Sequence, residues 1–396
     1  MSDEQKSTQR QDIFKYLGLT ATFIGIVIPL IAGYFEYRQS VQQELDNSFR
    51  KIIIDLTSED NESRIAAATS MGTFVEIDNK YYYQAIDILV NRISTELDYN
   101  VVHSINASLE KAADKDYKMI VKKLLNVERM FFIQEYPLKQ RIKLADQKIS
   151  DIESLITVID DQSQNANIIA NSNQVLAEEF RKRYKDYYNE VDTLDQLTFK
   201  KQVAADLLSM FLMKSKSISI KGVEFFRNSM NGAVLTNINF SGVRFIRSAI
   251  SMSNLQDTNF KGTDFKHTVL TYSDLSGASF RNSNAEQTLF DGTVLKNADF
   301  HGSKFNEVFF LGADLNNTDF TNVRGLKPIY FYRAENFSKA KFSEQFLAQY
   351  NEQRDDFNDD YFTDYINNHS SLLNSRKDDL LKTLSEINMR ELNAQL

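Results

Sequence analysis

The chain has 396 residues, with 46 Lys and Arg against 54 Asp and Glu, which gives a formal net charge of -8. This balance argues against a general nucleic-acid coat, because binding to phosphates needs a cationic surface. Cysteine is absent, which excludes disulfides and cysteine-ligated metal sites, and the four histidines show no metal-ligand spacing.

An uncharged segment near the N-terminus predicts a transmembrane helix over 16–36, after a tail of residues 1–15. About 20 apolar residues span a hydrocarbon core of ~30 Å. A cleaved signal peptide and a buried core helix are the alternatives. We expect a single-pass protein of a bacterial inner membrane with its body in the cytoplasm, although the basic residues on the two sides balance. The residues expected to face lipid are Tyr16, Phe23, Ile26, Ile28, Leu30 and Phe35.

Residues 37–130 carry apolar residues every three to four positions, which is typical of amphipathic helices. Two related phrases, SEDNESRIAAATS and DYNVVHSINASLEKA, recur at a period of about 37 residues, close to that of HEAT repeats. The sequence therefore predicts two HEAT-like helical hairpins in this region.

Residues 131–216 are predicted to form long helices with a heptad seam. The seam consists of Ile142, Ala145, Ile149, Ile152, Ile156 and Ile159. A polar stretch at 160–167 interrupts it, and a separate third helix is expected at 198–214. Either a helical hairpin or self-association through the seam satisfies this pattern.

From residue 220 to residue 320 every fifth residue is apolar, most often Phe or Leu. Small or β-branched residues stand two positions before each of these centres, and Gly or Asn often stands two positions after. A period of five fits neither an α-helix nor a β-strand.

Segments such as ADLNN (313–317), SDLSG (273–277) and TDFTN (318–322) resemble the pentapeptide-repeat family. The resemblance implies a right-handed, four-sided β-helix over residues 217–326, with one pentapeptide per side and 20 residues per coil. The sequence agrees with this coil length, because identical residues recur every twenty positions in stacked columns. One such column is Leu235, Leu255, Leu275, Leu295 and Leu315.

In this fold the phenylalanines fill the interior, so function must come from the outer surface. One outer stripe becomes more apolar towards the C-terminus, which marks an interface. Either the C-terminal segment of the chain or a protein partner is expected to cover it. The predicted interaction residues are Met252, Val269, Tyr272, Leu289, Phe309 and Leu311.

Residues 327–396 are expected to form a C-terminal cap and an amphipathic helix. FSEQFLAQY (342–350) is the predicted helical cap of the open β-helix end. The amphipathic helix is expected at 375–392, with Ser375 as its N-cap.

Taken together, the pattern predicts an α+β multidomain protein: a transmembrane helix, an all-α HEAT-like and coiled-coil region, a quadrilateral β-helix and a helical cap. We expect a membrane-anchored, non-enzymatic scaffold that binds a protein partner or itself, with no cofactor, metal, small-molecule substrate or nucleic acid. One alternative is a membrane effector, for instance anti-phage, whose assembled spans permeabilise the bilayer. The other is a DNA mimic that binds a topoisomerase, as some pentapeptide-repeat proteins do, but 218–325 carry equal numbers of acidic and basic residues.

Overall fold

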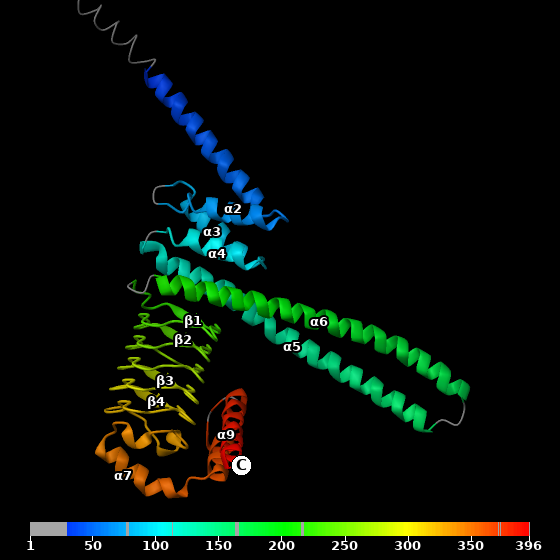
Figure 1. The fold of residues 1–396 in the computed structure, drawn as a ribbon, viewed down its shortest axis with the longest axis vertical. Helices are drawn as coiled ribbons and strands as arrows, with labels where there is room; N and C mark the ends of the chain where they lie inside the picture. The colour runs from blue at the N-terminus through cyan, green and yellow to red at the C-terminus, as the bar shows by residue number, and fades with distance from the viewer. Residues whose placement is uncertain are drawn as a thin grey trace, which may run out of the picture.

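The structure is a computed structural model, and it describes residues 30–76, 79–112, 114–162, 166–214, 218–370, 372 and 374–395. Figure 1 shows a helical half seated on one end of a rod of β-coils. Helix α7 lies at the other end of the rod, and helix α9 lies along its side.

The α-helices are a first helix over 30–55, α2 (Asn61–Met71), α3 (Tyr82–Ile93), α4 (Tyr99–Leu109), α5 (Tyr117–Gln162), α6 (Ala166–Lys214), α7 (Glu344–Gln353), α8 (Asp359–Asp364) and α9 (Asn374–Gln395). Short turns are the 3-10 helices η1 (Asp114–Asp116), η2 (Pro328–Phe331), η3 (Phe337–Lys339) and η4 (Arg354–Asp356), and the π-helix η5 (Tyr365–His369). The strands are β1 (Glu224–Phe226), β2 (Arg244–Ile246), β3 (Asn284–Glu286) and β4 (Lys304–Asn306).

Helices α2 to α4 and the start of α5 form the predicted helical middle. Asp60 and Asp98 cap the N-termini of α2 and α4, each accepting hydrogen bonds from backbone N–H groups. Helices α2 and α4 approach closely because Gly72 has no side chain: a Cβ there would lie 2.7 Å from the Ser108 hydroxyl. The helical middle is confirmed, and its HEAT-like character stays a prediction.

Helices α5 and α6 form a long antiparallel hairpin that projects away from the rest of the molecule (Figure 1). Ile149 and Ile152 of the predicted seam are buried where α5 packs against α6. The hairpin alternative is therefore the one that this chain adopts, and self-association through the seam stays a prediction.

Two boundaries predicted in this region are wrong. The separate helix expected at 198–214 is the C-terminal part of α6, because no Gly or Pro occurs between 166 and 214 to end the helix. Helix α5 likewise continues across the boundary predicted at residue 130, and it runs through Pro137.

The five-residue ladder forms a filled core. All 21 ladder residues from 220 to 320 are buried, with at most 2% of each exposed. Parallel pairing joins β1 to β2 and β3 to β4, and continues between coils through isolated bridges with the same 20-residue offset, as between Val234 and Asn254. The predicted coil length is confirmed.

The hydroxyl residues that precede the ladder residues bond the coils together from inside. Thr258 Oγ1 donates to the Leu235 carbonyl at 2.9 Å, and Thr263 Oγ1 donates to the Phe240 carbonyl at 2.8 Å. The same bond recurs along the rod with a sequence separation of 23 residues. These bonds satisfy buried hydroxyls and carbonyls together, which explains why Ser and Thr are frequent at this position.

The corners of the coils are left-handed, as the Gly and Asn pattern predicts. Every fifth residue from 222 to 322 has a φ between +52° and +75°. Six corners carry side chains that rarely adopt this conformation, namely Arg227, Arg247, Met252, Tyr272, Gln287 and Glu307. The left-handed conformation costs roughly 1–2 kcal/mol per such residue, so the stacked core must hold these corners in place.

The rod extends beyond the predicted end at residue 326. Glu335 pairs with Asp314 and Lys341 pairs with Asp319, so the last coil is longer than the others. Phe342 stacks on Phe320 with ring centroids 5.1 Å apart. Helix α7 then covers the open end, where Phe346 contacts Phe342, and the predicted cap is confirmed. Covering this end protects unpaired strand edges from other chains.

Candidate interaction surface

One side of the rod carries the apolar stripe, which we define as Ser229, Ala249, Val269, Leu289 and Phe309. These residues pair with one another from coil to coil, so they form one continuous column. Helix α8 and η5 contact Phe309 at the C-terminal end of the stripe, and helix α9 lies along the side of the rod (Figure 1).

Aromatic and leucine side chains of the C-terminal segment pack on the stripe. The Phe309 ring meets the rings of Phe362 and Tyr365 edge-on, with centroids 6.1 and 6.4 Å apart. Leu380 and Leu384 of α9 are buried in the same apolar core. The chain therefore covers its own stripe, which is one of the two alternatives that the sequence left open.

The structure divides the predicted interaction residues into two groups. Val269, Leu289, Phe309 and Leu311 are buried within this chain, with 6, 0, 0 and 1% exposed. Met252 and Tyr272 remain accessible, with 64 and 38% exposed. Their binding to a partner stays a prediction.

Polar contacts fasten α9 and α8 at the rim of the stripe. The Tyr272 hydroxyl donates to Glu386 Oε2 at 2.8 Å and lies 3.2 Å from the Thr383 hydroxyl. Arg333 forms ion pairs with Glu391 of α9 and Asp359 of α8, at 2.7 and 3.1 Å. Helix α9 begins at Asn374, so the predicted cap Ser375 lies inside the helix.

Beneath α9 the rod buries a carboxyl group. Asp291 is 1% exposed, and its Oδ1 accepts a hydrogen bond from the Leu311 N–H at 3.0 Å. Its Oδ2 finds no hydrogen-bond partner among the described residues. Burial raises the pKa of Asp291 well above its usual value, and the charge of Asp379 on α9 raises it further.

A second buried carboxyl joins the helical half to the rod. Glu128 of α5 is fully buried, and it accepts hydrogen bonds from the Ser229 N–H at 2.8 Å and from the Asn228 side-chain amide. Arg129 beside it donates to the Phe226 carbonyl at 2.8 Å. Burial raises the pKa of Glu128 to about 7, although these hydrogen bonds act in the opposite direction.

Stability should therefore fall as pH rises through neutrality. A carboxyl with a raised pKa stabilises the folded state below its ordinary pKa of 4.5, and this contribution is lost as pH rises towards 7. We expect the unfolding free energy to drop by on the order of 3 kcal/mol between pH 5 and pH 8 from this group. Glu128→Gln should remove that part of the pH dependence, measured by urea unfolding.

The control for this prediction is Glu178→Gln at an exposed position of α6. It should leave the pH dependence of wild type intact. Asp291 contributes a decline of the same sign, which the Glu128→Gln variant retains. If Glu128→Gln and Glu178→Gln show the same pH profile, the joint does not depend on the protonation of Glu128.

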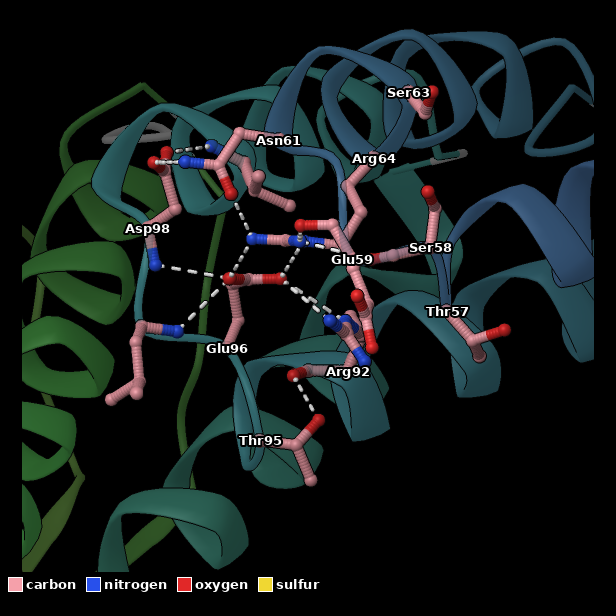
Figure 2. A network of polar contacts seen from close by, with 12 residues as sticks. Thr57, Ser58, Glu59, Asn61, Ser63, Arg64, Arg92, Thr95, Glu96 and Asp98 are labelled. Carbon is pink, nitrogen blue, oxygen red and sulfur yellow. Dashed lines mark hydrogen bonds and ion pairs between the residues drawn. The ribbon is translucent and has the colours of Figure 1, made fainter.

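A third buried polar cluster lies in the helical middle (Figure 2). Glu96 is 2% exposed and accepts hydrogen bonds from Arg64 Nε at 3.1 Å and Arg92 Nη2 at 2.9 Å. Arg64 also donates to the carbonyls of Ser58 and Glu59, so the cluster ties the loop before α2 to the α3–α4 turn. Sequence reasoning did not single out these residues, because their spacing resembles that of ordinary surface charges.

The predicted membrane segment is described only at its C-terminal end. Tyr16, Phe23, Ile26 and Ile28 lie outside the described residues. Every side chain of the first helix from 30 to 44 is exposed, Leu30 and Phe35 among them. Within the described part of the chain, no helix has the length and apolarity needed to cross a bilayer.

One open groove lies where the α5–α6 hairpin leaves the body. It has a volume of about 680 Å³, and half of its twelve lining residues are apolar, among them Met130, Ile133 and Leu197. In the residues that the structure describes, no three His, Asp or Glu side chains gather in the way a metal site requires.

Comparison with known proteins identifies the rod. The family model described as pentapeptide repeats matches residues 225–262, 253–284 and 286–322, in 8 copies. Pentapeptide repeats are generally non-enzymatic, and no catalytic family matches. No curated protein matches the chain.

Several solved structures align with the rod. A pentapeptide repeat protein from the Arabidopsis thaliana thylakoid lumen is 20% identical over 32% of this chain and 86% of its own, with a TM-score of 0.22. Rfr23 from the cyanobacterium Cyanothece 51142 is 15% identical over 31% of this chain and 88% of its own, with a TM-score of 0.17. QnrB1, a plasmid-mediated fluoroquinolone resistance protein, is 20% identical over 36% of this chain and 73% of its own, with a TM-score of 0.14.

The family match, the filled ladder and the 20-residue coils all concern the same stretch of sequence. Residues 225–322 of this chain are a pentapeptide-repeat region.

Proposed function

We propose that the protein is a membrane-anchored, non-enzymatic scaffold whose pentapeptide-repeat rod binds a protein partner. The observation that carries the proposal is the filled interior of the rod. Its ladder residues leave no space for a small molecule inside the rod. A partner can therefore bind only to the outer sides of the rod and to the helices packed on them.

The charges on the rod favour a protein partner over mimicry of DNA. Basic residues stand beside acidic ones on neighbouring coils, as in the ion pairs Arg244–Glu224 at 2.7 Å and Arg281–Asp299 at 2.7 Å. A duplex mimic needs a continuous excess of negative charge along its surface. Alternating charges instead suit a partner whose own surface carries both signs.

The first helix supports the membrane anchor. Leu30, Tyr34, Phe35 and Tyr37 are 55–68% exposed, so the body of the protein does not bury them. Arg38 lies over the Tyr34 ring at 5.6 Å. Aromatic and basic side chains at the end of an apolar helix are typical of the membrane interface, where Tyr and Arg sit at the level of the headgroups.

Deleting residues 1–36 should move the protein from the membrane pellet to the soluble fraction, with at least a tenfold change in their ratio. The reason is that this deletion removes the apolar segment that precedes the body. Fractionation of expressing cells, followed by immunoblotting, measures the change. Deleting residues 1–15 is the matched control and should leave the protein in the pellet.

A truncated chain that still pellets with membranes contradicts the anchor. Dye release from cells or vesicles separates the scaffold from a membrane effector, because a scaffold releases no dye. Leakage that requires residues 16–36 would favour the effector instead.

A further inference from the structure

Helix α9 covers the stripe with few buried side chains. Of its 22 residues, three have side chains that the structure describes as buried: Leu380, Thr383 and Leu384. Leu392 and Met389 on the same helix are 53 and 55% exposed. The apolar part of its attachment is therefore one short seam, flanked by the polar contacts of Tyr272 and Arg333.

The backbone does not tie α9 to the rod. The last coil is joined to its neighbour by backbone bonds, for example from the Leu315 N–H to the Glu335 carbonyl at 3.0 Å. No backbone-to-backbone hydrogen bond joins α9 to the rod in the described part of the chain, and the rod backbone accepts only from a side chain of α9, Arg376, whose Nη2 donates to the His267 carbonyl at 3.4 Å. Helix α9 can therefore leave the stripe while the ladder between coils stays intact.

Polar atoms buried without a partner on α9 and on the rod weaken the attachment of the helix. Asp291 Oδ2, Arg376 Nε and Asn388 Oδ1 are buried and find no hydrogen-bond partner among the described residues. Release of α9 returns all three atoms to water, which offsets part of the cost of exposing the stripe.

The corner beside α9 is shaped to receive a helix. Gly312 has a φ of +68°, and a Cβ placed there would lie 3.0 Å from the Ile387 side chain of α9. The absence of a side chain at this corner lets the helix approach the rod. Tyr272 and Arg333 flank the corner and bond the acidic residues Glu386 and Glu391.

We propose that the apolar stripe is a helix-binding surface which α9 occupies as a displaceable cover, and that the partner supplies an amphipathic helix with the chemistry of α9. Such a helix carries two leucines four residues apart, an aliphatic residue to fill the Gly312 corner and acidic residues to meet Tyr272 and Arg333. This inference rests on the proposed scaffold function and names the class of partner.

The test uses the full chain in detergent micelles and a fluorescent peptide with the sequence of residues 374–395. Leu380→Asp in the protein should weaken the attachment of α9, because it places a carboxylate in the buried seam, and it leaves the sequence of the rod unchanged. The wild-type peptide should then bind this variant at least tenfold more tightly than it binds the wild-type protein, measured by fluorescence anisotropy. A peptide carrying Leu380→Asp should not bind.

Leu392→Asp provides the matched control, because it makes the same substitution at an exposed position of the same helix. That variant should bind the peptide no better than wild type. The proposal is overturned if the Leu380→Asp protein fails to bind the peptide while its rod amides keep wild-type protection from hydrogen exchange.

A reversible lock gives a second measurement, since the chain has no cysteine of its own. In a Gly312→Cys/Ile387→Cys variant the two residues lie close enough for a disulfide, because a Cβ at residue 312 would be 3.7 Å from Ile387 Cγ1. Combined with Leu380→Asp, oxidation should abolish peptide binding and reduction should restore it. Binding that survives oxidation places the peptide elsewhere and contradicts the proposal.

Hydrogen exchange of the wild-type protein tests the cover without any substitution. Amides of α9 should exchange at least tenfold faster than those of the rod, and equal protection would overturn the proposal. None of these measurements depends on the membrane, so failure of the anchor and failure of the helix-binding surface are distinguishable.

Discussion

Phe280→Ala should lower the unfolding free energy by about 3–5 kcal/mol, because it removes a ring from the middle of a continuous stack. The Phe280 ring lies 4.9 Å from that of Phe260 and 4.4 Å from that of Phe300, nearly parallel to both. The side chain is fully buried, and neighbouring coils held by backbone bonds cannot collapse into the space that it leaves. Urea unfolding followed by circular dichroism measures the loss.

Two further variants separate packing from a general effect of the substitution. Phe280→Leu should cost clearly less than Phe280→Ala, because leucine already fills another column of the same rod. Phe199→Ala, on a ring that is 46% exposed, should change stability by less than about 1 kcal/mol. Equal losses for Phe280→Ala and Phe199→Ala would contradict a solid core.

Glu96→Ala should destabilise the helical middle by about 3–5 kcal/mol, because it leaves buried guanidinium groups without their carboxylate. Arg64, which is 8% exposed, loses two hydrogen bonds to Glu96, and Arg92 loses its ion pair. The backbone N–H groups of Leu97 and Asp98 also lose their acceptor. Thermal unfolding of the purified protein measures this effect.

The matched control is Glu179→Ala in the exposed pair with Arg183, 2.7 Å apart, which should cost no more than about 1 kcal/mol. The pKa of Glu96 is lowered: burial opposes ionisation, but hydrogen bonds from Asp98 N–H, Arg92, Leu97 N–H and Arg64 outweigh it. Its contribution is therefore present above the ordinary pKa of 4.5 and disappears as pH falls through the lowered pKa. Wild type and Glu96→Ala should therefore have similar stability in acid. If the difference in their stability persists at low pH, the buried charge of Glu96 does not cause it.

The last coil of the rod forms where the five-residue period of the sequence is already lost. The five-residue period ends in the sequence at Gly325. The chain nevertheless makes one more coil, in which Glu335 pairs with Asp314. Phe331 replaces the next ladder residue and stacks on Phe310, with ring planes 2° apart. The register is one residue longer here, so a search at multiples of five misses it.

In the α5–α6 hairpin the sequence pattern is clear, but it leaves the partner of each helix open. Its heptad seam predicts that two apolar helix faces meet, but a seam is satisfied equally by the same chain and by another one. In the structure α5 packs against α6 of the same chain, so the two faces meet within one chain. The position of Glu128 against Asn228 was also beyond sequence reasoning, because 100 residues separate the two side chains.

The sequence by itself determined the rod: its coil length, its filled interior and its left-handed corners. Each of these follows from repetition, because a residue in a stacked coil always has the same neighbours one turn away. Only the tertiary structure decided that α9 covers the apolar stripe. The contact between Tyr272 and Thr383 joins residues 111 positions apart, and no local pattern records which of several apolar faces a distant helix will choose.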